Sequence, residues 1–101
     1  MLALNNIADI LKPILEKQRI YKVTVFGSYA RGNFTPSSDI DLVVDSKGEL
    51  KGISFFIAID EISKALPIPS DIYEQREIKK GSALYNEISR EGVVIYDKQG
   101  L

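Results

Sequence analysis

The composition of this 101-residue chain excludes several kinds of chemistry. The formal net charge of -1 and the pI near 5.4 argue against a protein that binds nucleic acid by neutralising many phosphates, so no DNA binding is expected. The sequence has no cysteine and no histidine, which removes disulfides, thiolate nucleophiles, the usual zinc sites and an imidazole base. Catalysis would therefore depend on carboxylates, hydroxyls, lysine, arginine or a hard metal ion. We expect one domain over residues 1–101, without targeting or membrane segments, in the cytoplasm.

Helical and strand patterns alternate along the chain and predict four elements of each kind. Helices are expected over residues 3–18, 28–31, 50–66 and 84–92. Strands are expected over residues 21–26, 39–45, 70–75 and 93–97. Pro13 should kink or divide the first helix, while Gly32 and Gly92 should cap the second and the fourth. The order predicts an α+β fold of α/β-like character, with helices packed on a mixed four-stranded sheet.

The helix expected over residues 50–66 carries two adjacent apolar stripes. The first should face the core and consists of Phe55, Ala58, Ile59, Ile62, Ala65 and Leu66. The second consists of Ile53, Phe56 and Ile57. This second stripe is either the edge of a wide core face or a protein-binding surface that would support a homo-oligomer or a hetero-oligomer.

The stretch "FGSYARGNFTPSSDIDLVV" combines a Gly-Ser corner with two aspartates. Asp39 and Asp41 lie two residues apart on a strand, so their side chains should share one face about 6 to 7 Å apart at the backbone. A divalent cation would offset their repulsion, and oxygen-only ligands favour Mg²⁺. Gly27 permits a close approach, and Ser28 opens a helix whose free N–H groups suit an anion. The pattern indicates a nucleotide polyphosphate site; a simple turn and a solvated strand edge are the plainer alternatives.

Gly-Ser-x-Ala-Arg-Gly followed by Ser-Asp-Ile-Asp-Leu resembles the signature of the DNA polymerase β-like nucleotidyltransferases. It is most similar to the minimal nucleotidyltransferases, called MNT or MntA, that are encoded beside HEPN-domain proteins. The resemblance extends from about Val23 to Tyr96 and implies that residues 1–101 form a single minimal nucleotidyltransferase domain with a polymerase β palm-like fold. It also implies a third carboxylate on a neighbouring strand. Asp71 is the candidate, with an ordinary turn aspartate as the alternative.

The resemblance assigns catalytic and metal-binding roles to three aspartates. Asp39 and Asp41 would bind the metal ions, and Asp71 would bind the second ion and help to deprotonate the acceptor. A carboxylate is the plausible base in a chain without histidine. Two Mg²⁺ ions, roughly 3.5 to 4 Å apart, would assist in-line attack of an acceptor hydroxyl on the α-phosphorus of ATP.

Nucleotide-binding residues are expected at the Gly-Ser corner. Ser28 and the amides after Gly27 would hold the outgoing phosphates. Arg31 would either reach phosphate or pair with a carboxylate and lock the short helix. Asp45 and Asp60 are alternative candidates for the catalytic carboxylates, but both are expected to be solvated.

The resemblance also implies an activity and a partner. MNT proteins of this type act as antitoxins of HEPN ribonuclease toxins, and characterised pairs transfer AMP from ATP to a toxin tyrosine. We therefore expect an Mg²⁺-dependent protein adenylyltransferase with ATP as substrate and a HEPN-domain toxin as partner. One alternative is a non-catalytic antitoxin that neutralises the toxin by binding alone. Another is a small-molecule nucleotidyltransferase of the aminoglycoside-modifying type, which would need an added domain or a dimer-formed cleft.

Overall fold

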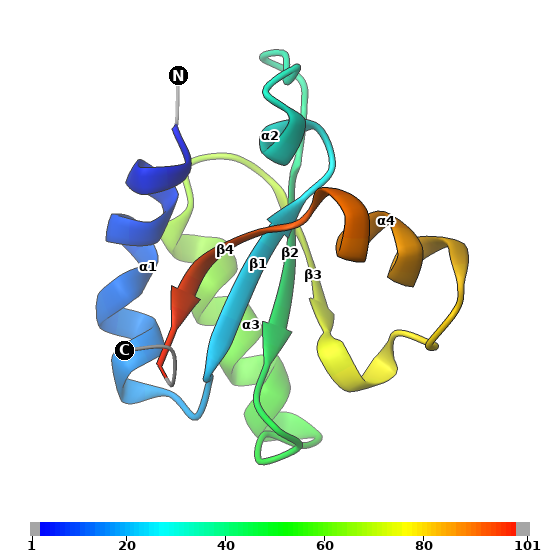
Figure 1. Cartoon of the computed structure of the whole chain (residues 1–101). Coiled ribbons are helices and arrows are strands. Elements are labelled where there is room, and N and C mark those ends of the chain that lie inside the picture. Colours follow the sequence, from blue (N-terminus) through cyan, green and yellow to red (C-terminus); the bar gives the residue numbers. More distant parts are fainter. Residues whose placement is uncertain (1–2, 99–101) are drawn as a thin grey trace.

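The computed structural model describes residues 3–98, in which helices and strands alternate as expected (Figure 1). The α-helices are α1 (Leu4–Lys17), α2 (Ser28–Arg31), α3 (Ile53–Ala65) and α4 (Ala83–Glu91). The strands are β1 (Lys22–Phe26), β2 (Ile40–Asp45), β3 (Ser70–Glu74) and β4 (Val93–Asp97). A short 3₁₀ helix, η1 (Gln75–Glu77), follows β3. Among the residues described, no helix has the length and apolar character needed to cross a bilayer.

The four strands form one mixed sheet in the order β3-β2-β1-β4. β1 pairs antiparallel with both β2 and β4, whereas β2 and β3 are parallel. A parallel pair needs a long crossover, and α3 provides it between β2 and β3. The expected fold class, a mixed four-stranded sheet with helices packed on it, is confirmed.

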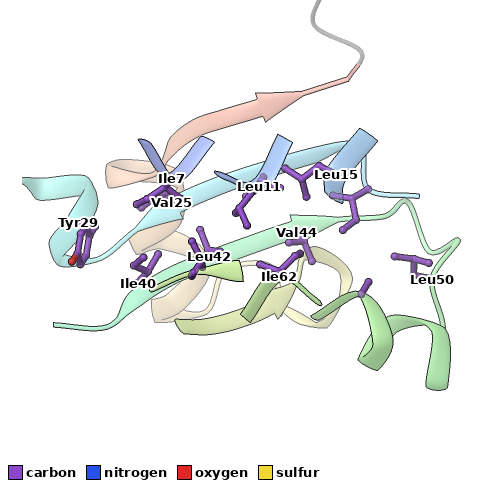
Figure 2. Packing of buried hydrophobic residues seen from close by; sticks show 14 residues of the cluster. Ile7, Leu11, Leu15, Val25, Tyr29, Ile40, Leu42, Val44, Leu50 and Ile62 are labelled. Atoms are coloured by element: carbon purple, nitrogen blue, oxygen red, sulfur yellow. The ribbon is translucent and has the colours of Figure 1, made fainter. Parts of the chain in front are cut away.

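The hydrophobic core lies between one face of the sheet and the two helices α1 and α3 (Figure 2). On β2, the side chains of Ile40, Leu42 and Val44 point into this core and are almost fully buried. Tyr29 closes the core at the α2 end, and Leu50 closes it at the other end. The alternate residues of each strand face the opposite side of the sheet, where α4 packs against β1.

Pro13 does not divide α1, which is continuous from Leu4 to Lys17, so the expectation of a division was wrong. A proline inside a helix removes the hydrogen bond to the carbonyl four residues earlier, here that of Asp9. Both residues are exposed, so water can satisfy that carbonyl. The opposite side of α1 is anchored in the core by three fully buried side chains: Ile7, Leu11 and Leu15.

The helix expected over residues 50–66 is shorter than predicted and spans Ile53–Ala65. Gly52 has φ +56°, which lies outside the right-handed helical region, so the helix begins after it. At the other end Pro67 disfavours the helical conformation of the preceding residue. Leu66 is accordingly extended, with φ -82° and ψ 136°.

The two apolar stripes of α3 differ in their environment. The core-facing stripe is buried or half-buried except for Ala65, which is exposed, so its assignment to the core was wrong. The second stripe is open to solvent: Ile53 is 79% exposed, Phe56 69% and Ile57 59%. These three side chains are not the edge of the core, which leaves the protein-binding surface as the surviving hypothesis.

One polar pair is buried where β3 meets the turn after β2. Ser46 is 0% exposed and Glu74 is 7% exposed. The Ser46 hydroxyl donates to Glu74 Oε2 at 2.8 Å, and the Leu50 N–H donates to Ser46 Oγ at 3.4 Å. Ser46 therefore joins the end of the edge strand to the start of the connection that leads to α3.

We expect Ser46→Ala to lower the free energy of unfolding by about 1 to 3 kcal/mol, because it leaves the buried Glu74 carboxylate short of a donor. Urea unfolding measures the change. Ser37→Ala, in an exposed loop, is the matched control and should shift stability by no more than about 0.5 kcal/mol. Equal effects of the two substitutions would contradict the structural importance of the Ser46 to Glu74 contact.

Candidate active site

Three strands have an end at the same side of the sheet. β1 ends just before Gly27, and β3 begins one residue before Asp71. β2 begins between Asp39 and Asp41, so Asp39 precedes the strand that was expected to include it. Because β2 runs antiparallel to β1 and parallel to β3, these three ends meet at the edge where α2 stands (Figure 1).

The sheet register places two of the predicted carboxylates on adjacent strands. Asp41 is the partner of Asp71 on β3 and of Phe26 on β1. Neighbouring strands lie about 4.8 Å apart, so side chains of such partners on the same face are within reach of each other. Asp41 alternates with Ile40 and Leu42 of the core, and its carboxyl therefore lies on the opposite face. The structure thus brings Asp71 beside Asp41, although 29 sequence positions separate them.

The electrostatics of Asp41 reflect this crowding. Burial of its carboxyl, followed by the charges of Asp71, Asp39 and Glu87, raises the pKa of Asp41 to about 6. A side-chain hydrogen bond with Asp71 favours the protonated form of Asp41 and raises its pKa further. Ionised Asp41 is consequently less favourable here than an exposed aspartate would be, and a positive charge close to it would offset that cost.

Gly27 has a backbone conformation that favours glycine, and Asp41 lies directly against it. Its φ of +73° lies in the region that favours glycine, and a Cβ there would come 2.3 Å from Asp41 Oδ2. The Gly27 carbonyl accepts the N–H groups of Ala30 and Arg31 at 3.1 Å, which forms the first turn of α2. Gly32 ends α2 in the left-handed conformation at φ +79°, so its predicted capping role is confirmed.

The loop between α2 and β2, which leads to Asp39, is ordered by contacts of its own side chains and backbone. Phe34 stacks on Tyr29, with ring centroids 4.2 Å apart and planes at 5°. Within the loop, the Thr35 N–H donates to Ser38 Oγ at 2.8 Å and the Ser38 N–H donates to the Thr35 carbonyl at 3.0 Å. These contacts fix the chain immediately before Asp39.

Arg31 is turned toward α4. Its guanidinium contacts Glu91 with an N to O distance of 2.9 Å, and the hydrogen bond from Arg31 lowers the pKa of Glu91. This contact agrees with the second alternative for Arg31, a carboxylate pair that locks the short helix. It also ties the Gly27 corner to the C-terminal end of α4.

The two alternative carboxylates, Asp45 and Asp60, lie away from Asp41 and Asp71. Asp45 ends β2, and its carboxylate accepts the Lys47 N–H at 2.9 Å. Asp60 is exposed on α3 and pairs with Lys64 at 2.9 Å. Each therefore has a local structural role.

Two residues near the carboxylates were missed by sequence reasoning. The charge of Glu87, on α4, acts on both Asp41 and Tyr73. Tyr73 follows Asp71 by two residues on β3, and its ring packs on Phe26. Strand alternation could have identified Tyr73. No local signal connected α4 with β2, because that proximity arises only from the tertiary packing.

The chemistry of the donors fits a hard cation. All candidate ligands are carboxylate oxygens, the type that Mg²⁺ prefers, and a cation would relieve the repulsion recorded in the pKa of Asp41. Within residues 3–98, no three acidic side chains are grouped closely enough to hold an ion by themselves. Magnesium commonly takes one or two carboxylates together with water and substrate phosphates, so a nucleotide would complete its shell.

A hollow of about 570 Å³ lies elsewhere, between α1 and β4. Its lining mixes charges of both signs, including Asp9, Glu16, Lys12 and Lys98. Such a mixture lacks the concentration of one charge that would favour a phosphate or a cation.

Comparison with known proteins identifies the family. The model of the nucleotidyltransferase domain matches residues 5–95. The chain belongs to this family. The enzyme class expected from the Gly-Ser and Asp-x-Asp motifs, a nucleotidyltransferase, is thereby confirmed, and its substrate class is a nucleotide.

Two relatives are similar over most of the chain. Protein adenylyltransferase MntA of Thermococcus cleftensis is 34% identical over 88 residues, or 82% of this chain and 88% of the relative. A protein of Methanocaldococcus jannaschii, provisionally named a protein adenylyltransferase, is 35% identical over 78% of this chain and 85% of its own length. The predicted resemblance to the minimal nucleotidyltransferases is confirmed.

Solved structures share the fold of this nucleotidyltransferase. A toxin–antitoxin complex with AMP-PNP contains a chain with a TM-score of 0.74 and 21% identity, matched over 91% of this chain and 74% of that one. A complex of a tri-AMPylated Shewanella oneidensis HEPN toxin with an MNT antitoxin gives a TM-score of 0.62 and 21% identity, over 95% of this chain and 71% of that one. The expected nucleotidyltransferase fold is confirmed.

Asp41→Asn should stabilise the metal-free protein above pH 6. The raised pKa means that the native state binds a proton more tightly than the unfolded chain between about pH 4 and 6, so wild-type stability falls as pH rises through that window. Because Asp41 is only half-buried, solvent screening limits the expected gain to about 1 to 2 kcal/mol.

Urea unfolding with EDTA at pH 4 and at pH 7.5 checks this. The gain should be present at pH 7.5 and absent at pH 4, whereas exposed Asp60→Asn should change stability by less than about 0.5 kcal/mol at either pH. A destabilising effect of Asp41→Asn at pH 7.5 would contradict the electrostatic account.

Proposed function

We propose that this chain is an Mg²⁺-dependent protein adenylyltransferase that transfers AMP from ATP to a tyrosine of a HEPN-domain toxin and thereby acts as its antitoxin. The observation that carries the proposal is the juxtaposition of Asp41, Asp71 and the Gly27 corner at one sheet edge of a nucleotidyltransferase. The relative named protein adenylyltransferase MntA and the solved complex of an AMPylated HEPN toxin with an MNT antitoxin support the substrate and the partner.

The Gly-Ser corner would hold the triphosphate. Gly27 brings the backbone close to the carboxylates without a clash, and Ser28 begins α2 with a hydroxyl and backbone N–H groups suited to phosphate oxygens. Binding there would direct the α-phosphorus toward Asp39 and Asp41. Arg31 remains a candidate phosphate ligand, but it would first have to leave Glu91.

Asp39, Asp41 and Asp71 would supply carboxylate ligands for Mg²⁺, with water and the nucleotide phosphates completing its coordination, and the bound ion would neutralise charge on the phosphates and on the departing pyrophosphate. Asp71, on the edge strand, would take the proton from the acceptor hydroxyl. The acceptor oxygen then forms a bond to the α-phosphorus as the bond from that phosphorus to the pyrophosphate oxygen breaks. AMP remains on the acceptor, and pyrophosphate leaves.

We also propose that residues 1–101 form one minimal domain that acts in the cytoplasm, where ATP and the toxin are available. The three exposed apolar side chains of α3 (Ile53, Phe56 and Ile57) are the candidate surface for oligomer formation. They lie on the helix that covers the opposite face of the sheet, so a protein bound there would leave the carboxylates accessible.

We expect the wild-type protein with Mg²⁺ and labelled ATP to transfer label to its purified HEPN partner, and Asp39→Asn combined with Asp41→Asn to abolish transfer. Removing these carboxylates removes the proposed metal ligands without changing side-chain size. Asp60→Asn is the matched control and should retain full transfer. If wild type transfers no label, yet wild type and the double variant neutralise the toxin equally, binding alone is the function.

Mg²⁺ together with ATP should raise the thermal midpoint of the wild-type protein. ATP with EDTA should not raise it, and neither should Mg²⁺ with EDTA. A ligand at a hundred times its dissociation constant adds about 2.7 kcal/mol to stability. The shift should disappear in Asp41→Asn and persist in Asp60→Asn. A full shift by ATP in EDTA would argue against a metal-dependent site.

A further inference from the structure

Tyr73 is an exposed aromatic side chain on the sheet face that carries the reactive carboxylates. It lies two residues after Asp71 on β3, so both side chains point to that face. Tyr73 is 38% exposed, and its ring packs on that of Phe26, with centroids 5.8 Å apart and planes at 52°. Phe26 is only 4% exposed. Tyr73 is therefore supported from one side by a fixed ring and open on the other.

The order of the strands suggests what approaches this open side. From β1 across β2 to β3, the sheet carries first the Gly27 corner, then Asp41, and then Asp71 and Tyr73. A triphosphate at the corner occupies the β1 side of Asp41, which leaves the β3 side for the acceptor. Because β3 is the edge strand of the sheet, no further strand of residues 3–98 blocks the approach.

We propose that Tyr73 is a specificity-determining residue on which the aromatic ring of the acceptor tyrosine packs during AMP transfer. The inference rests on the proposed function and deepens it, because it assigns the part of this chain that recognises a phenolic acceptor. Aromatic pairs are most favourable offset or edge to face, with centroids about 4.5 to 7 Å apart, and such contact would aim the acceptor hydroxyl toward Asp71 and the α-phosphorus. A serine or threonine acceptor would gain nothing from this contact.

Steady-state kinetics on the partner toxin, with Mg²⁺ and ATP, test the proposal with three substitutions. Tyr73→Phe keeps the ring and should stay within about twofold of wild type in kcat/KM for the acceptor. Tyr73→Ala and Tyr73→Leu remove the ring and should each lower that value about tenfold, mainly through a higher KM for the acceptor. The KM for ATP and the stabilisation by Mg²⁺ and ATP should not change.

Val94→Ala is the matched control, because Val94 is 47% exposed on the opposite edge strand, β4; it should leave all these values unchanged. Thermal midpoints establish that each variant is folded. An unchanged KM for the acceptor in Tyr73→Ala, an equal loss in Tyr73→Phe, or a loss confined to the KM for ATP would overturn the proposal. The last result would assign Tyr73 to the nucleotide base. Absence of transfer by wild type would instead defeat the proposed function itself, and this inference with it.

Discussion

The register between β2 and β3 is the constraint on which the site depends. Ile40, Leu42 and Val44 are buried in the core, and a shift of the strand by one residue would expose them and turn Asp41 inward. Burying each such side chain stabilises the fold by about 1.5 to 3 kcal/mol. The core therefore fixes the position of Asp41 beside Asp71, and it does so against the repulsion between the two carboxylates.

The pairing of β2 with β1 places Asp41 directly against the Gly27 corner. Asp41 Oδ2 lies where a Cβ of residue 27 would be, so the Gly27 corner and the Asp41 carboxyl lie directly against each other. Arg31, at the other end of α2, pairs with Glu91 and connects this corner to α4. The helix α4 also carries Glu87, whose charge acts on Asp41. The negative field at the site thus has a contribution from the fourth helix.

Local sequence patterns predicted the elements and the motif, but not every tertiary relation. Periodicity predicted the helices and strands, and strand alternation predicted Asp39 and Asp41 on one face of a strand, whereas Asp39 lies just before β2. The division of α1 at Pro13, one of the two expected outcomes, did not occur, and the local sequence does not show that water can reach the carbonyl of Asp9. The contact of Asp71 with Asp41 needed the family resemblance, since strand pairing leaves no local signal. Further residues, Glu87 and Tyr73, became evident only from the packed structure.

The carboxylates lie where the ends of adjacent strands meet, which limits what their placement requires. The Gly27 corner, Asp41 and Asp71 come from adjacent strand ends, so they require only the rigid sheet and its core for their placement. The cost is an open site, because the helices that cover the sheet most fully, α1 and α3, lie on the other face. An open site suits an acceptor that brings its own rigid surface. A protein side chain presented over β3 meets that requirement, whereas a free small molecule would have few walls to hold it.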